Sequence, residues 1–410
     1  MPAVLATEPD SRTRAWLFLP FGLAPAVVVG YVMITVSDAL SRAGVPLSSV
    51  SVLVTAAFLP ATLMFLWAPL IDAVGRRQRW ILAGVLLLCA AAAGLAMTPH
   101  TEVGLPLLVP LSAMAGFGYS LVSAAQKGLA VELLAPKRRV AAAGWAGAGS
   151  GIGLAASGGA LAASAHLSAL GTALLLAALA GIPAFVALAM LEHRAAPRAR
   201  GAATLRDVLR DTRRLFGTGP GRLTLAICVL PIGSSAALLM VGALGPDFQS
   251  SEALVGVWVG TARSLGMAAG ALVGARLWLR VGTRSGCVLS TLALAVYSLL
   301  VLAVPKTPQG FAVVVCGYGF LSGAALSALS GIILETVSDR ASSTQASVLV
   351  AAGNLGNVYL PPIGGIAHDA AGLTGLLLAD SAAGVAGLLL YLLCARVLHQ
   401  HPFRTSRVGD

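Results

Sequence analysis

The sequence predicts an all-α membrane protein of twelve transmembrane helices, arranged as two six-helix bundles with both termini in the cytoplasm. Three observations lead to this fold class. Of the 410 residues, 57% are hydrophobic and 10% are charged, whereas a soluble globular protein carries roughly 25% charged residues. The chain contains twelve long apolar runs. Lysine and arginine gather in every second connection between these runs, which is typical of cytoplasmic loops.

Each predicted span is an apolar run of about 20 residues, the length at which a helix crosses the hydrocarbon core. The first six spans are expected at 15–37, 50–72, 80–98, 104–130, 139–163 and 167–191. The second six are expected at 222–245, 253–278, 286–304, 309–335, 342–363 and 371–396. Glycine and proline within these runs fit the assignment, because both are more frequent in membrane helices than in soluble ones.

The orientation follows from the distribution of the 27 lysines and arginines. With the N-terminus inside, 23 of them fall in inner segments and two, Arg42 and Lys306, in outer loops. The remaining two, Lys127 and Arg263, lie within spans. Basic loops beside anionic lipid account for the net charge of +11, so we expect no nucleic-acid partner.

One long hydrophilic segment divides the chain into an N-terminal bundle (1–191), a basic linker (192–221) and a C-terminal bundle (222–410). Within the linker, Thr204 and Asp207 have the spacing of a capping box. The residues that follow place Leu205, Val208, Leu209 and Phe216 on one helical face. This pattern predicts an amphipathic helix on the inner membrane surface. A solvated charged linker is the alternative.

The two bundles also show weak internal similarity. Gly75 and Arg77 follow span 2, and Gly282 and Arg284 occupy the same place after span 8, 207 residues later. Glu132 after span 4 and Glu335 after span 10 are separated by 203 residues. Two matches at nearly the same offset favour a 6+6 repeat, which is common in transporters.

Charged motifs follow spans 2 and 4. The stretch FLWAPLIDAVGRRQRW, from Phe65 to Trp80, contains Asp72, Gly75, Arg76 and Arg77; after span 4 come Glu132, Pro136 and Arg139. Together with the twelve-span pattern, which covers essentially the whole chain, these motifs resemble the major facilitator superfamily. Over about 45 residues around Phe65–Trp80, the chain is most similar to the branch of AmpG-type muropeptide permeases, acetyl-CoA transporters and siderophore importers.

The resemblance implies that these motifs form a conformational gate. Asp72 would latch the N-terminal half to span 11, Gly75 would form a tight turn, and Arg76 and Arg77 would serve as partners and anchors. Glu132 and Arg139 belong to the second motif of the gate. Elementary electrostatics agrees, because span 11 begins near Ser342–Thr344, and a helix N-terminus favours a nearby carboxylate. The alternative is simple anchoring of span 2 by its arginines.

Charged residues inside spans are costly and usually functional. Arg263 lies near the predicted midplane of span 8, where it could bind an anionic solute or pair with an acid. Asp380 in span 12 could exchange protons during transport, or it could be the acid that pairs with Arg263. A purely structural Arg263–Asp380 ion pair remains the alternative. We expect Lys127, at the inner end of span 4, to extend its ammonium group towards water.

Uncharged polar pairs complete the predicted solute pathway. Asn354 and Asn357 stand three residues apart in span 11, and Tyr31 and Thr35 stand four apart in span 1, so each pair shares a helical face. They could line a cavity, or they could form hydrogen bonds between helices.

The expected function is secondary active transport of a small organic solute by alternating access, with proton-coupled import as the first expectation. The chain has no GxxxxGK[ST] nucleotide loop. An exporter of amphiphilic molecules or drugs is the alternative. The resemblance disfavours it, because the exporter branch of the family has a proline in the glycine motif of span 5, and the stretch Gly144–Gly159 contains none. A polytopic membrane enzyme or a non-transporting sensor is more remote, since HExxH and GxSxG are absent.

These considerations set the expected partners and location. The five cysteines form no CxxC pair, so we expect no metal, and nothing in the sequence indicates a cofactor or catalytic residues. The solute, the lipid bilayer and protons are the expected partners of a monomer. We expect it in a bacterial inner membrane.

Overall fold

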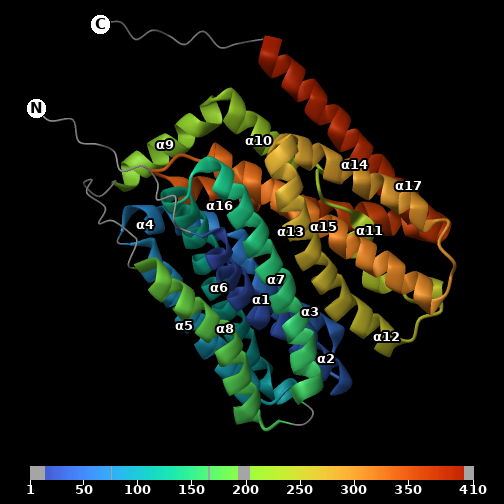
Figure 1. Cartoon of the computed structure of the whole chain (residues 1–410). Helices are drawn as coiled ribbons and strands as arrows, with labels where there is room; N and C mark the ends of the chain where they lie inside the picture. The colour runs from blue at the N-terminus through green and yellow to red at the C-terminus, as the bar shows by residue number, and fades with distance from the viewer. Residues whose placement is uncertain (1–13, 75, 165–166, 193–203, 401–410) are drawn as a thin grey trace, which may run out of the picture.

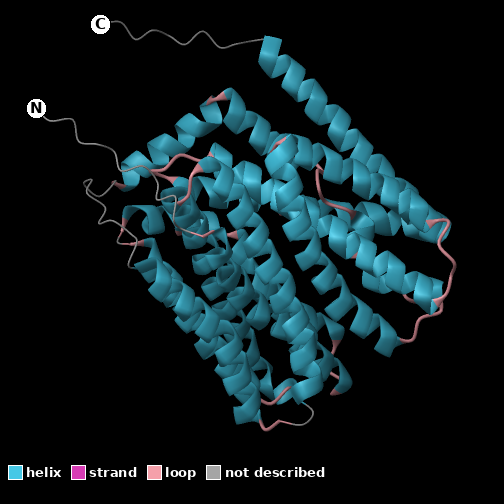
Figure 2. Cartoon of the chain, in the orientation of Figure 1, coloured by secondary structure: helices cyan, strands magenta, loops and turns pink. Residues whose placement is uncertain are grey.

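The computed structural model describes residues 14–74, 76–164, 167–192 and 204–400, and every regular element within these ranges is a helix (Figures 1 and 2). The elements up to residue 192 are η1 (Ala15–Phe18), α1 (Leu19–Tyr31), η2 (Val32–Val36), α2 (Ser37–Arg42), α3 (Leu47–Thr62), η3 (Met64–Leu66), α4 (Ala68–Ala73), α5 (Arg77–Met97), η4 (Glu102–Gly104), α6 (Leu105–Leu133), α7 (Pro136–Ser164) and α8 (Ala169–Glu192). Those from residue 204 are α9 (Leu205–Gly217), α10 (Gly219–Val229), α11 (Ala236–Leu239), η5 (Val241–Leu244), η6 (Pro246–Phe248), α12 (Glu252–Val257), η7 (Trp258–Ala262), α13 (Arg263–Val281), α14 (Thr283–Val301), α15 (Pro308–Thr336), α16 (Ser342–Gly353) and α17 (Gly356–Gln400).

The described chain contains seven helical stretches that are long and apolar enough to cross a membrane. One of them, Ser342–Val397, has 56 residues. It is not a single straight helix, because Ala371 and Gly372 have non-helical backbone angles inside α17. The predicted spans fall mainly on helical residues, with a non-helical break within 222–245. The total of twelve crossings, the positions of the termini and the division at residues 191 and 222 stay predictions.

Two helix breaks differ from the sequence expectation. The predicted continuous span at 222–245 is interrupted after Val229, where Pro231 and Gly233 (φ 73°) separate α10 from α11. A proline cannot donate the backbone hydrogen bond that would continue the helix. Conversely, Pro361 and Pro362 lie inside α17, and the break falls upstream, between the end of α16 and Gly356.

Small residues allow α7 to pack closely on two neighbours. Gly149 faces the backbone of Leu19 in α1, and Gly151 faces Ser264 and Ala268 in α13; a Cβ atom at either glycine would collide with main-chain atoms. The glycine-rich stretch is therefore a helix-packing surface. In Figure 1, α7 lies between α1 and α13, so it joins the part of the chain before the linker to the part after it.

Helix α9 caps one end of the bundle, which we call the α9 end (Figure 1). The predicted capping box is confirmed: Thr204 and Asp207 exchange side-chain and backbone hydrogen bonds. Hydrogen bonding from Thr204 lowers the pKa of the Asp207 carboxyl. On its predicted apolar face, Val208 is buried, whereas Leu205 and Leu209 are 48% and 49% exposed. Helix α9 contacts α4 and α16. That its exposed leucines lie on the inner membrane surface stays a prediction.

Candidate functional site

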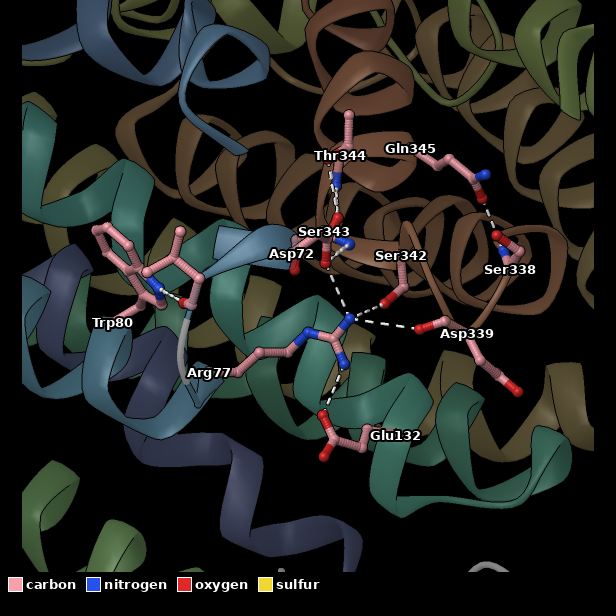
Figure 3. A network of polar contacts seen from close by, with 11 residues as sticks. Asp72, Arg77, Trp80, Glu132, Ser338, Asp339, Ser342, Ser343, Thr344 and Gln345 are labelled. Atoms are coloured by element: carbon pink, nitrogen blue, oxygen red, sulfur yellow. Dashed lines mark hydrogen bonds and ion pairs between the residues drawn. The ribbon is translucent and has the colours of Figure 1, made fainter. Parts of the chain in front are cut away.

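Asp72 joins α4 to the first turn of α16 (Figure 3). Its carboxylate is buried and accepts hydrogen bonds from the Ser343 N–H (3.2 Å), the Thr344 N–H (2.7 Å) and the Thr344 hydroxyl (2.8 Å). The first amides of a helix have no partner within the helix and carry partial positive charge. The structure thus brings Asp72 to the N-terminus of α16, the position expected from the sequence.

Arg77 is the centre of the same network. The residue is 2% exposed, and its guanidinium group contacts Asp72 (2.9 Å) and Glu132 (2.6 Å) as ion pairs. It also donates to the Ser342 hydroxyl (2.9 Å) and to the Asp339 carbonyl oxygen (3.4 Å). Two carboxylates therefore share one cation, and the N-terminus of α16 compensates part of the remaining negative charge. The contacts connect α4, α5 and α6 with the chain around α16.

Arg139 makes a second connection beside this network. It donates to the carbonyl oxygens of Val131 (2.8 Å) and Leu134 (3.0 Å), which end α6. A basic side chain at a helix C-terminus satisfies carbonyl groups that have no helical partner. Arg139 also lies 3.4 Å from the carboxylate of Asp339, which is exposed. The gate residues Asp72, Arg77, Glu132 and Arg139 are thus clustered, whereas Arg76 is exposed and Gly75 lies outside the described residues.

Gln345 was not singled out from the sequence, although its side chain is buried in the same region. Its amide donates to the Asp211 carbonyl of α9 (3.2 Å) and accepts from the Ser338 N–H (2.7 Å). It therefore ties α9 to the start of α16. The run of polar residues after Ala341 was the available signal, because a helix in lipid rarely begins with four buried polar side chains unless they have partners.

Asp380 has local partners at the break after α10. Its carboxylate accepts from the hydroxyls of Ser235 (2.8 Å) and Ser298 (2.6 Å), and from the N–H of Ala236 at the start of α11. Ser298 also shares a hydrogen bond with Tyr318. Asp380 forms no ion pair with Arg263 among the described residues, because hydroxyl and amide groups bind its carboxylate instead.

The other predicted pathway residues are dispersed. Arg263 begins α13 and is half-buried, with its backbone against Gly319 of α15. Tyr31 is fully buried in the core and stacks edge-on against His100. Thr35 donates to the Ser157 carbonyl of α7 (3.4 Å), which is a hydrogen bond between helices.

The asparagine pair lies at the break before α17. Asn354 is the C-cap of α16 and is half-buried, whereas Asn357 is exposed. The backbone N–H of Asn357 donates to the Asn354 carbonyl (3.1 Å), so both residues belong to the turn between the two helices. Their expected shared helical face is therefore interrupted.

A cavity of about 110 Å³ lies between α1, α6, α7 and α15. Its polar lining comes mainly from α6, with Tyr119, Ser123, Gln126 and Lys127. The Lys127 ammonium donates to the hydroxyl (2.6 Å) and the carbonyl (3.2 Å) of Ser123, one turn earlier. The sequence expectation that Lys127 extends towards water is therefore wrong, because its side chain turns back along α6 into the cavity.

Comparisons with known proteins agree with this architecture. The sequence matches the family model of the Major Facilitator Superfamily over residues 21–223 and 223–407. It is 28% identical over 363 residues to the anhydromuropeptide permease of Escherichia coli strain K12, covering 84% of this chain and 72% of the permease. The permease of strain O157:H7 matches equally.

Two solved structures share the fold at low sequence identity. The human organic anion transporter MFSD10 (TETRAN) superimposes with a TM-score of 0.64 at 17% identity, covering 92% of this chain and 97% of that protein. A bacterial homologue of the iron transporter ferroportin, in an outward-facing state, superimposes with a TM-score of 0.65 at 16% identity, covering 94% and 100%.

Proposed function

This chain belongs to the Major Facilitator Superfamily and is a multi-pass transmembrane transporter, and we propose that it moves a small organic solute by alternating access. The network around Arg77 carries the proposal. It joins Asp72 and Glu132 to residues near Ser342, more than 200 positions later, at the α9 end. Such a connection can form and break as two halves rock about a shared cavity.

The proposed topology has twelve spans, with bundles at 1–191 and 222–410 and both termini in the cytoplasm of a bacterium. In this arrangement the α9 end faces the cytoplasm, and the Asp72 network closes the solute pathway on that side. The concentration of arginine at this end supports the orientation. Residues Asp72, Arg77, Glu132 and Arg139 then form the inner gate, with Gln345 fastening α9 to it.

We further propose that import is coupled to protons. The similarity to anhydromuropeptide permeases makes an anhydromuropeptide the first solute to test. Proteoliposomes should take up more solute when the outside is acidified than when the pH is equal, because a symporter moves its solute with protons entering down their gradient. The vesicles must be shown to hold the pH gradient during the measurement. Uptake that is unchanged by this gradient would then exclude proton symport.

Arg263 is proposed as a solute-binding residue. It lies in the proposed span 8 and is half-buried, and none of the ion pairs of the described chain involves it. We expect Arg263→Ala to lower uptake of an anionic solute about tenfold, since an ion contact in a partly buried site contributes on the order of 1.4 kcal/mol or more. Arg276→Ala, in the same helix, is the matched control. Normal uptake of every solute by Arg263→Ala would rule out this role.

A further inference from the structure

We propose that the cavity beside Lys127 binds a carboxylate group of the transported solute, with the apolar part of the solute held by the opposite wall. This inference rests on the proposed transport function and specifies its substrate class, a small organic anion. It concerns a site at the inner end of α6, distinct from Arg263. Four features of the cavity support it: its charge, its hydrogen-bonding groups, its apolar wall and its position behind the gate.

The charge of the cavity is positive and uncompensated by its own walls. Of the residues that line it, Lys127 alone carries a formal charge. Among the described residues, no carboxylate lies within ion-pairing distance of its ammonium group. Its two hydrogen bonds to Ser123 supply neutral acceptors only. A cation within the membrane region is costly without a counter-charge, and a bound carboxylate would provide one.

Neutral polar groups surround the ammonium group on the same surface. On α6, Ser123 lies one turn and Tyr119 two turns before Lys127; Ser150 comes from α7 and Ser330 from α15. The side-chain oxygen of Gln126 is buried without a hydrogen-bond partner. Rotation of this amide by half a turn would present its NH₂ group at the same place. The cavity can therefore supply an ammonium, an amide and hydroxyl donors to the two oxygens of a carboxylate.

The opposite wall is apolar. Phe18, Phe21 and Pro25 line it from the first elements of the chain, and Leu326 and Leu334 line it from α15. A site with a few polar groups and a predominantly apolar lining selects ligands that have both characters. At about 110 Å³ the cavity holds only part of a solute, so we assign to it the carboxylate and the carbon atoms next to it.

The cavity spans parts of the chain that the gate also connects. Its α6 and α7 walls lead directly to Glu132 and Arg139, and its α15 wall leads to the Asp339 loop. Gly128, next to Lys127, is packed against Arg77 and Ser343, leaving no room for a Cβ atom. Only Gly128 thus separates Lys127, and a carboxylate bound to it, from the Asp72–Arg77 network. In the proposed cycle this network opens to release the solute at the α9 end.

The test is a binding experiment on the purified full-length protein, which requires no ion gradient. Thermal unfolding is measured with sodium isobutyrate, with isobutyramide as an uncharged compound of the same shape, and with sodium chloride at equal ionic strength. We expect isobutyrate to raise the unfolding temperature more than either control. In Lys127→Met the apparent affinity for isobutyrate should fall at least tenfold, Lys127→Arg should retain most of it, and Lys137→Met, at an exposed lysine nearby, should match wild type.

Each alternative outcome contradicts the proposal in a defined way. Equal effects of isobutyrate and isobutyramide on wild type, or no effect of either, would show that no carboxylate is recognised. An equal effect of chloride would show a general salt response. An unchanged isobutyrate response in Lys127→Met would place the anion elsewhere. If Lys127→Met does not fold, the wild-type comparisons still test whether a carboxylate is recognised, and Lys127→Gln takes the place of Lys127→Met to test where it binds. Lys127-dependent binding without gradient-driven uptake would leave this site standing and contradict proton-coupled import.

Discussion

Asp72→Asn should reduce solute uptake by tenfold or more while the protein still inserts and folds. The carboxylate accepts three hydrogen bonds from α16 and pairs with Arg77. In the proposed cycle these four contacts break when the α9 end opens. Removing one partner of a buried ion pair costs on the order of 3 kcal/mol. At about 1.4 kcal/mol per factor of ten, this cost depopulates the closed-gate state, from which the proposed import cycle collects solute.

The measurement compares initial uptake rates in proteoliposomes containing equal amounts of folded transporter. Asp38→Asn is the matched control, because Asp38 also pairs with an arginine, Arg42, but in an exposed i,i+4 bridge. Exposed pairs of this kind contribute about 0.5 kcal/mol or less, so uptake should stay within twofold of wild type. If Asp72→Asn transports normally and unfolds at the wild-type temperature, the network has no role in gating.

The contrast between Arg76 and Arg77 shows how much of the gate could be predicted from the sequence. The polar start of α16 and the carboxylate of Asp72 could be matched from sequence, since a helix N-terminus attracts an anion wherever the two meet. Arg76 and Arg77 could not be told apart, because both match the motif and both suit a cytoplasmic loop equally. Only the direction of α5, which begins at Arg77, turns that side chain inward.

The environment of Lys127 and the break in span 7 could not be predicted from the sequence. A lysine near a span end can reach water along its own helix, unless neighbouring helices close over it, as α1, α7 and α15 do here. Likewise, Pro231 and Gly233 indicate a possible break, but not that the freed amides meet a carboxylate from α17. Both outcomes depend on contacts between distant helices, which neither periodicity nor composition encodes.

Asp380→Asn should decide whether that carboxylate holds the helices together or takes part in proton coupling. Asparagine has nearly the same shape but only one acceptor oxygen, so it cannot accept from Ser235, Ser298 and the Ala236 N–H together. An unsatisfied buried polar group costs about 1–3 kcal/mol, more where a charged partner is lost. We therefore expect a lower unfolding temperature and at least a fivefold loss of folded protein in the membrane.

The uptake of the surviving protein separates the two roles. With a structural Asp380, transport per folded molecule and its response to external acid should both match wild type. Asp369→Asn, at an exposed acid of the same helix, is the control for charge on α17. If Asp380→Asn still exchanges solute across the membrane but its uptake no longer responds to a pH gradient, Asp380 is instead the proton-coupling acid. We expect the structural result, because hydroxyl and amide donors already surround the carboxylate and connect α11, α14 and α17 at the break in span 7.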